Sequence, residues 1–389
     1  MERIYMDYNA TTPLHPEVLD AMLPFLKDNF GNPSSIHWAG REIKKYIDDA
    51  RKKVADLLNA DPSEVIFTGG GSESDNLAIK GAVETLRKKG NHIITTQVEH
   101  PAVLNTCEHM EKTGYGVTYL SVDHEGMIDL DELKDSITDR TILISIMYAN
   151  NETGTIFPLK EIGEVAADKG ILFHTDAVQA VGKIPIDLKD LKVDLLSLTG
   201  HKLYGPKGIG SLYVKKGITL SPLIHGGHQE RSLRAGTENT PGIVGLGKAC
   251  EIADRDMESQ SLALTKLRDR LYKGITDRLD HVKLNGHSEN RLPNTLNIGF
   301  EFVEGESILI NLDLEGIAVS TGSACSSGSL SPSHVLTAMG IPSEVAQGSM
   351  RFSLGRDNKE EDVDYVISVL PKIIERLRSI SPLYSKSKN

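Results

Sequence analysis

Residues 171–208 read ILFHTDAVQAVGKIPIDLKDLKVDLLSLTGHKLYGPKG, and this stretch indicates the fold. Two short apolar runs in it, Ile171–Thr175 and Leu195–Leu198, have the composition of buried strands. A polar residue follows each run, Asp176 after the first and Lys202 after the second. Buried strands joined by crossovers form a mostly parallel sheet, and ligands bind beyond the carboxyl ends of its strands. We therefore expect Asp176 and Lys202 to lie at one edge of a sheet.

The same alternation extends over the first two thirds of the chain. Further apolar runs at Val65–Thr68, Ile93–Thr96 and Ile142–Met147 are expected to be strands, and helical periodicity lies between them. After about Asp254 the pattern changes to a long helix, two strand-like runs and a last amphipathic helix. These patterns predict an α/β fold, with a large domain whose mostly parallel sheet is flanked by helices and a smaller α+β domain.

Composition places the chain among ordinary folded proteins. It has 389 residues, of which 39% are apolar and 25% charged, and its net charge is −11. An acidic chain disfavours binding to nucleic acid or to an anionic membrane, because neutralising phosphate requires a basic face. The first residues lack the layout of a secretory signal, and the longest apolar stretch, Ile142–Ala149, is too short to span a bilayer. We expect a cytoplasmic protein with no membrane and no nucleic-acid partner.

Three cysteines occur, Cys107, Cys250 and Cys325. Such a small, odd set excludes a disulfide scaffold and fits a reducing compartment. Their separations also exclude a local zinc knuckle, so no motif predicts a metal site. Cys107 and Cys250 recur with apolar neighbours at helical spacing and are predicted to be core residues. Cys325 lies in the polar segment Ser320–Ser329, where we expect an exposed, mobile loop.

The glycine loop Gly69–Ser74 follows the strand expected at 65–68 and leads into a helix. A helix that begins in such a loop presents free N–H groups and the positive end of its dipole to an anion. The loop matches neither the Walker A box nor the dinucleotide-binding pattern. A plain turn with Ser72 as the helix cap explains the loop equally well.

Other strand ends carry residues whose chemistry becomes specific only in combination. Asp176 is either a helix cap or the partner of a buried cation. Taken singly, His100 is typical of a capping histidine, Asn151 of a turn and Lys202 of a solvated side chain. Together with the glycine loop they supply an anion cradle, an aromatic base, a carboxamide, an acid and an amine. Pyridoxal phosphate requires such a set, because its phosphate prefers a helix N-terminus, its ring nitrogen an acid and its aldehyde a lysine.

A set of motifs resembles those of NifS/IscS-type cysteine desulfurases, which are class-V aminotransferase-like enzymes. The motifs are Tyr5–Pro13 (YMDYNATTP), Gly31–Ser35 (GNPSS), Thr175–Gln179 (TDAVQ), Gly200–Gly208 (GHKLYGPKG), Gly322–Gly328 (GSACSSG) and Arg351–Arg356 (RFSLGR). The resemblance runs from about Tyr5 to about Leu377 and implies the type I fold of pyridoxal-phosphate enzymes, as a homodimer. It implies a seven-stranded type of sheet in a large domain over 16–258. A small domain, 1–15 with 259–389, would carry the cysteine loop.

The resemblance implies pyridoxal 5'-phosphate as the cofactor and assigns residues to it. Lys202 would bind it covalently, Asp176 would pair with the ring nitrogen, and Gln179 would hydrogen-bond the phenolic oxygen. His100 would stack on the ring and help to move protons. Residues expected to bind the phosphate are Gly71, Ser72, Thr199 and His201, with Thr237 added from the other subunit. Family members often have Thr in place of Ser72 and Ser in place of Thr199, and both exchanges keep a hydroxyl.

The resemblance also implies a reaction. Asn151 and Arg351 would hold the substrate L-cysteine, and Lys202 would remove its Cα proton. The Cys325 thiolate would take the sulfur as a persulfide, giving L-alanine, and a protein acceptor such as an iron–sulfur scaffold would receive it. The only metal contact expected is a transient one through the Cys325 persulfide. On chemical grounds alone, Arg351 is either a solvated arginine or a two-pronged clamp on a carboxylate.

Three alternatives to cysteine desulfurase activity stay open from the sequence. A selenocysteine lyase or an aminotransferase would use the same fold, although an aminotransferase has no need of Cys325. A catalytically idle sulfur carrier or adaptor is the third, and intact Lys202, Asp176 and His100 argue against it.

Overall fold

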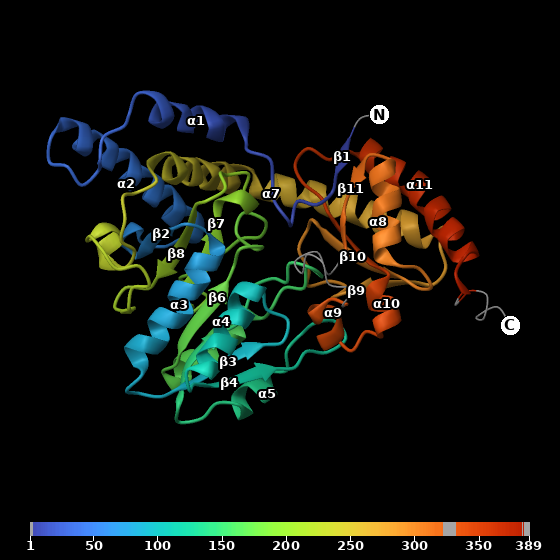
Figure 1. Ribbon diagram of the computed structural model, residues 1–389, viewed down its shortest axis with the longest axis horizontal. Helices are drawn as coiled ribbons and strands as arrows, with labels where there is room; N and C mark the ends of the chain where they lie inside the picture. Colours follow the sequence, from blue (N-terminus) through green and yellow to red (C-terminus); the bar gives the residue numbers. More distant parts are fainter. Residues whose placement is uncertain (1–2, 322–331, 383, 385–389) are drawn as a thin grey trace.

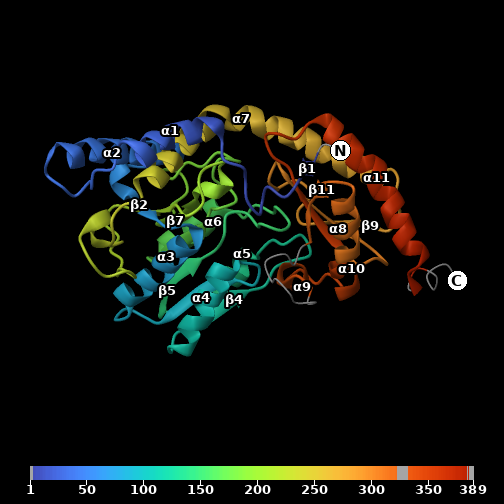
Figure 2. The ribbon, with the colours of Figure 1, turned by 45° about the horizontal axis from the view of Figure 1, so that its top comes forward.

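The computed structural model describes residues 3–321, 332–382 and 384. Over these residues the strands form three sheets, with seven, four and two strands. Figure 1 shows two units side by side, one around the seven-stranded sheet and one around the four-stranded sheet. Helix α7 (Thr240–Thr276) runs along the top of both units in Figure 2.

The large sheet is mostly parallel, as the sequence predicts. Its strand order is β2 (Val65–Thr68), β8 (Gly210–Val214), β7 (Leu195–Thr199), β6 (Leu172–Asp176), β5 (Thr141–Ser145), β3 (His92–Thr96) and β4 (Gly116–Leu120). Only β8 runs antiparallel to its neighbours in this sheet. The five predicted strands match β2, β3, β5, β6 and β7 to within a residue or two at each end. The edge strand β4 was not predicted, because it is half-buried and lacks a continuous apolar run.

Both faces of the large sheet are buried, which explains the continuous apolar runs of its strands. One face forms a core with α3 (Gly71–Leu86) and α4 (Pro101–Lys112), and Ile93, Leu143 and Leu195 belong to it. The residue that directly follows each of these three belongs to the core on the other face of the sheet. That core also contains residues of α2 (Trp38–Leu58), α6 (Leu159–Lys169) and the first part of α7. Cys107 and Cys250 are buried, one in each core, so the prediction for these two residues is confirmed.

The smaller unit has its own core around antiparallel strands. Its sheet has the order β12 (Ser320–Thr321), β13 (Ser349–Ser353), β10 (Thr295–Phe300) and β9 (Val282–Asn285). The second part of α7, α8 (Gly305–Leu314) and α11 (Glu360–Ser379) pack around it. The chain start joins this core, because β1 (Ile4–Tyr5) pairs in parallel with β11 (Ile317–Ala318) and Met6 is buried there.

Helix α7 passes from one core to the other without a break. Its residues up to Ile252 contribute to the core of the large unit, and those from Leu264 contribute to the core of the small unit. The sequence pattern suggested that the charged stretch 254–258 precedes this helix. In the structure the stretch lies inside the helix. The domain boundary at residue 258 stays a prediction.

The remaining elements are short, apart from α1. They are α1 (Pro16–Lys27), α5 (Leu130–Asp135), α9 (His334–Ala338), α10 (Ser343–Gln347) and the 3₁₀ turns η1 (Pro62–Glu64), η2 (Gly200–Lys202) and η3 (Gln229–Ser232). None of the helices in the described part of the chain combines the length and the apolar character that crossing a bilayer requires.

Candidate functional site

The carboxyl ends of five strands bring the predicted site residues to one edge of the large sheet. Asp176 ends β6, and Lys202 ends η2, the turn directly after β7. These two strands pair in parallel, with Asp176 opposite Ser197. His100 is the N-cap of α4, which follows β3, and Asn151 lies in the turn after β5. The predicted gathering of these residues at the sheet edge agrees with this topology.

Helix α3 begins directly after β2 in the way that an anion-binding helix begins. Its N-cap is Gly70, which makes no side-chain capping hydrogen bond. The alternative in which Ser72 caps the helix is therefore wrong: Ser72 is the second helical residue and is exposed. A Cβ on Gly71 would lie 2.9 Å from Val178 Cγ2 and 3.8 Å from Thr199 Cβ. A side chain at this position would crowd Val178, whereas Thr199 lies at ordinary contact distance, so the backbone of Gly71 packs closely against Val178.

The Lys202 amine lies against the N-terminal segment. Its Nζ donates to the carbonyl oxygen of Ala10 at 2.6 Å and to that of Asn9. The residue is partly buried, which differs from the solvated lysine that a lone Lys would suggest. The turn after β7 thus places an amine in a partly buried, polar setting.

Asp176 and His100 form what we call the edge pair. Asp176 is buried, and its Oδ1 accepts a hydrogen bond from the Val178 N–H at 2.9 Å, so it caps the turn that follows β6. Burial raises the pKa of Asp176, while His100, the Val178 amide and Lys202 oppose that rise. Burial lowers the pKa of His100, and Asp176 partly offsets this. At neutral pH the edge pair therefore presents an uncharged imidazole close to a buried acid.

The other residues assigned to the cofactor differ in how far they are buried. Thr199 is buried, and its hydroxyl donates to the Ile209 carbonyl at 3.2 Å. His201 Nδ1 lies 3.2 Å from Thr11 Oγ1, and burial, with Lys202 and Lys207 nearby, lowers the pKa of His201 to about 4. Thr237 is exposed in the segment before α7.

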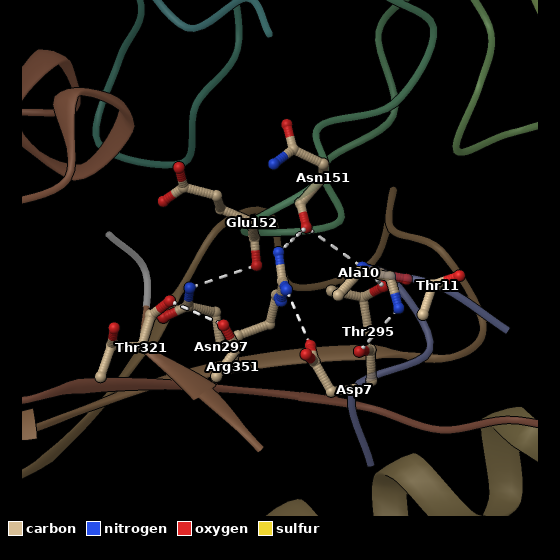
Figure 3. A network of polar contacts seen from close by, with 12 residues as sticks. Asp7, Ala10, Thr11, Asn151, Glu152, Thr295, Asn297, Thr321 and Arg351 are labelled. Atoms are coloured by element: carbon tan, nitrogen blue, oxygen red, sulfur yellow. Dashed lines mark hydrogen bonds and ion pairs between the residues drawn. The ribbon is translucent and has the colours of Figure 1, made fainter. Parts of the chain in front are cut away.

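Arg351 reaches the site from the small unit. It lies in β13 and is 3% exposed, so the interpretation as a solvated arginine is wrong. Its Nη1 donates to the Asn151 carbonyl at 3.0 Å and its Nη2 to Asp7 Oδ1 at 2.8 Å (Figure 3). The Nε atom is buried and has no hydrogen-bond partner among the described residues. A buried donor without a partner calls for a ligand or water to satisfy it.

Asn9 connects the two units beside this arginine. Its side-chain nitrogen donates to the Asn151 carbonyl at 3.1 Å and to Thr295 Oγ1 at 2.9 Å. Its side-chain oxygen accepts from Asn294 at 3.1 Å and from Lys183 Nζ at 3.2 Å. Asn9 is 2% exposed, so these bonds form inside the protein.

Sequence reasoning assigned no role to Asp7, Asn9 or Lys183. The first two lie in the N-terminal motif and the third follows the TDAVQ motif. No periodicity marks them, because each acts on residues that are distant in the sequence. Only the motif match at residues 5–13 could have drawn attention to Asp7 and Asn9.

The cysteines divide by environment. Cys325 lies outside the described residues. Burial raises the pKa of the Cys107 and Cys250 thiols to about 12 in each case. Neither is a reactive thiolate at neutral pH. In the described part of the chain, no group of three or more His, Cys, Asp or Glu side chains is arranged to hold a metal ion.

The chain resembles known proteins over nearly its whole length. The aminotransferase class-V family matches residues 4–366. A cysteine desulfurase IscS of Clostridium botulinum is 56% identical over 385 residues, 98% of this chain and 97% of the relative. A solved NifS-like protein is 41% identical with a TM-score of 0.91, covering 97% of this chain and 100% of the other. A structure of SspA in complex with cysteine is 42% identical with a TM-score of 0.82, covering 90% and 98% of the two chains. The chain therefore belongs to the aminotransferase class-V family, among the cysteine desulfurases.

Proposed function

We propose that this protein is a pyridoxal-phosphate-dependent cysteine desulfurase that converts L-cysteine to L-alanine and leaves the sulfur on Cys325 as a persulfide. The observation that carries the proposal is the placement of the Lys202 amine in the turn after β7, near enough to the buried acid that ends β6 to lower the pKa of that acid. An amine, a buried acid and an uncharged imidazole at one sheet edge are the groups that this chemistry requires.

The residues present fit pyridoxal phosphate. The start of α3 at Gly70, with Gly71 packed tightly against Val178 and at contact distance from Thr199, forms a cradle of the kind that binds phosphate. Lys202 would hold the cofactor, Asp176 would pair with the ring nitrogen, and His100 would lie against the ring. Ser72 and His201 would add phosphate contacts. When bound, the cofactor supplies a ring that accepts negative charge from the substrate Cα.

Arg351 and Asn151 would position the substrate. The buried Nε of Arg351 offers a donor in a water-poor setting, which suits a carboxylate such as that of an amino acid. Asn151 lies beside it, since its carbonyl already accepts from Arg351 Nη1 at 3.0 Å. The structural neighbour that was solved in complex with cysteine supports a cysteine-sized substrate.

Side chains of the protein would carry out proton transfer and accept the sulfur. Lys202 would take the proton from the substrate Cα, and His100, uncharged at neutral pH, would accept and return a proton nearby. Cys325 would accept the sulfur. It is the only cysteine left for this role, because burial keeps the Cys107 and Cys250 thiols protonated.

The active form is proposed to be a homodimer. Thr237 is exposed and well suited to contact a second copy, where it would add to the phosphate site of that copy. The persulfide would then pass to a protein acceptor such as an iron–sulfur scaffold.

Sulfur transfer to Cys325 can be tested by treating the loaded protein with L-cysteine. We expect alanine release and a one-sulfur adduct on Cys325, found by mass spectrometry of peptides. Cys325→Ser should lose both, because a serine oxygen does not accept the sulfur. Cys107→Ser, the matched control, should keep both. Normal turnover in Cys325→Ser, or an adduct on Cys107 or Cys250, contradicts the proposal.

A further inference from the structure

Gln179 and Lys183 lie on one side of two consecutive turns that follow β6. The Val181 N–H donates to the Ala177 carbonyl at 3.0 Å, and that of Lys183 donates to the Ala180 carbonyl at 3.0 Å. Bonds of this helical type place residues four apart on the same side. Lys183 Nζ accordingly donates to Gln179 Oε1 at 2.6 Å.

The backbone around Lys183 is held in place on both sides. Gly182 has a φ of +73°, and a Cβ there would lie 2.5 Å from Leu203 Cδ2, so this position requires glycine. From α7, the Ser261 hydroxyl donates to the Lys183 carbonyl at 2.6 Å. Lys183 is therefore directed toward Gln179 by packing from two separate elements.

An amide group has an acceptor end and a donor end, and Lys183 determines which end faces which way. With Oε1 bonded to the lysine, Nε2 of Gln179 points away from it and donates to the Asn9 carbonyl at 3.0 Å. That same carbonyl accepts from Lys202 Nζ. Lys183 also donates to the side-chain oxygen of Asn9 at 3.2 Å, so it orients both amides next to the Lys202 amine.

We propose that Lys183 is a positioning residue, which keeps the N–H groups of Gln179 turned toward the phenolic oxygen of the bound cofactor. The inference rests on the proposed function. An N–H donor stabilises that oxygen in its negatively charged form, whereas an amide rotated by half a turn would place a carbonyl against it.

The charge of Lys183 is not needed for this role. Burial lowers the pKa of Lys183 well below its usual range, and Lys202 and Arg351 lower it further. Both the charged and the neutral amine have enough N–H groups for Gln179 Oε1 and Asn9 Oδ1.

The test compares the visible spectrum of the loaded protein in Lys183→Met, Lys183→Arg and Lys189→Met. Lys183→Met removes the donors, so we expect absorbance to move toward the form whose phenolic oxygen carries its own proton. We also expect cofactor retention on dialysis to weaken roughly tenfold, as for a lost hydrogen bond to a charged group. Lys183→Arg keeps donors and should restore most of both. Lys189 is exposed and bonded to Asn59, so Lys189→Met should match the wild type.

Gln179→Glu provides a second measurement that does not depend on the folding of Lys183→Met. A glutamate has acceptors at both ends and should give the same spectral change, and adding Lys183→Met should change it no further. A wild-type spectrum in Gln179→Glu, or in folded Lys183→Met, overturns the inference and leaves the proposed function intact. Wild-type protein that takes up no pyridoxal phosphate overturns both.

Discussion

Strand β6 carries members of two acid–histidine pairs with the same chemical groups. The edge pair is Asp176, the last residue of β6, and His100, and each of them shifts the pKa of the other. A second pair, here called the enclosed pair, joins His174, two residues earlier on β6, to Asp75 of α3, with Nε2 and Oδ1 3.6 Å apart. In the enclosed pair His174 is 0% exposed, and its two ring nitrogens lie 2.8 Å from Ser145 Oγ and 3.0 Å from Ser197 Oγ.

Burial acts on both pairs, but only one of them can meet a ligand. Burial lowers the pKa of His174 to about 3. Burial also raises the pKa of Asp75 well above its usual range, and Asp176 and Glu99 add to this rise. Both enclosed groups are therefore neutral, and the hydroxyls beside the ring occupy its nitrogens. His100 is partly exposed at the sheet edge, in a turn that follows a parallel strand. The position at the end of a strand, more than the residue type, therefore decides which acid and which histidine can take part in chemistry.

The largest expected effect is on Asp176. Asp176→Asn removes the acid that would pair with the ring nitrogen, so alanine release should fall by about 10³-fold, the upper range for loss of one preorganised electrostatic group. The protein should still bind pyridoxal phosphate and unfold at a similar urea concentration. Activity within a few-fold of the wild type would mean that Asp176 does not differ in role from the enclosed acid.

His100 should give the next largest effect. His100→Gln keeps a hydrogen-bonding side chain at the N-cap of α4 but removes a group that exchanges protons, so the rate should fall by about 10²-fold. The loss should appear in kcat more than in KM, because His100 is not assigned to substrate binding. His174→Gln, measured in parallel, should keep at least a third or so of the rate in the folded protein. Equal losses in the two variants would contradict a special role for the histidine at the sheet edge.

The positions of Asp176 and Lys202 at the sheet edge were predictable from sequence for a physical reason. Asp176 and Lys202 each follow a continuous apolar run, and a run buried on both faces marks a parallel strand and its end. Residues that act between units carry no such mark. Arg351 alternates with apolar neighbours and was expected on a polar face, yet all of β13 is buried, because that face is covered by the loop bearing Asn151 and by Asp7.

The enclosed pair shows the other limit of sequence reasoning. His174 lies in a stretch that the sequence analysis considered and Asp75 directly follows another, but nothing in residue type or spacing distinguishes a buried histidine from an accessible one. The distinction depends on α3 packing over the sheet, which places Asp75 against β6. The role of Lys183 could not be predicted for a related reason. Its partners, Gln179 and Asn9, come from two segments that meet only in the folded protein.

The enclosed histidine should contribute to the pH dependence of stability. The pKa of His174 is about 3 when folded and 6.5 in its ordinary state, so the unfolded chain binds more protons between these values. The contribution of His174 is therefore fully present above about pH 6.5 and is lost as pH falls, by about 1.4 kcal/mol per pH unit. Buried acids with raised pKa values make stability change with pH in the opposite direction. They are present both in the wild type and in a His174 variant, so they do not affect the difference between the two.

Urea unfolding of the wild type and of His174→Gln isolates this term. Between about pH 7 and about pH 5 the wild type should lose roughly 2 kcal/mol of stability relative to the variant. His100→Gln serves as the control and should show a smaller difference, because His100 is partly exposed. If the free energy of unfolding changed with pH in the same way in the wild type and in His174→Gln, His174 would have to take up a proton in the folded protein.

Asp75→Asn should have the smallest effect. Because burial keeps the Asp75 carboxyl protonated, a neutral amide of the same shape is a close substitute, and unfolding free energy should change by less than about 1 kcal/mol. Alanine release should stay within a few-fold of the wild type, in contrast to Asp176→Asn. Asp75→Ala leaves a cavity and removes one polar contact of Ser197, which keeps His174 as a partner. It should cost about 1–3 kcal/mol of stability with the rate of the folded protein maintained. A fall in rate for Asp75→Asn as large as that for Asp176→Asn would show that the two acids work as one unit, because the charge of Asp176 already raises the pKa of Asp75.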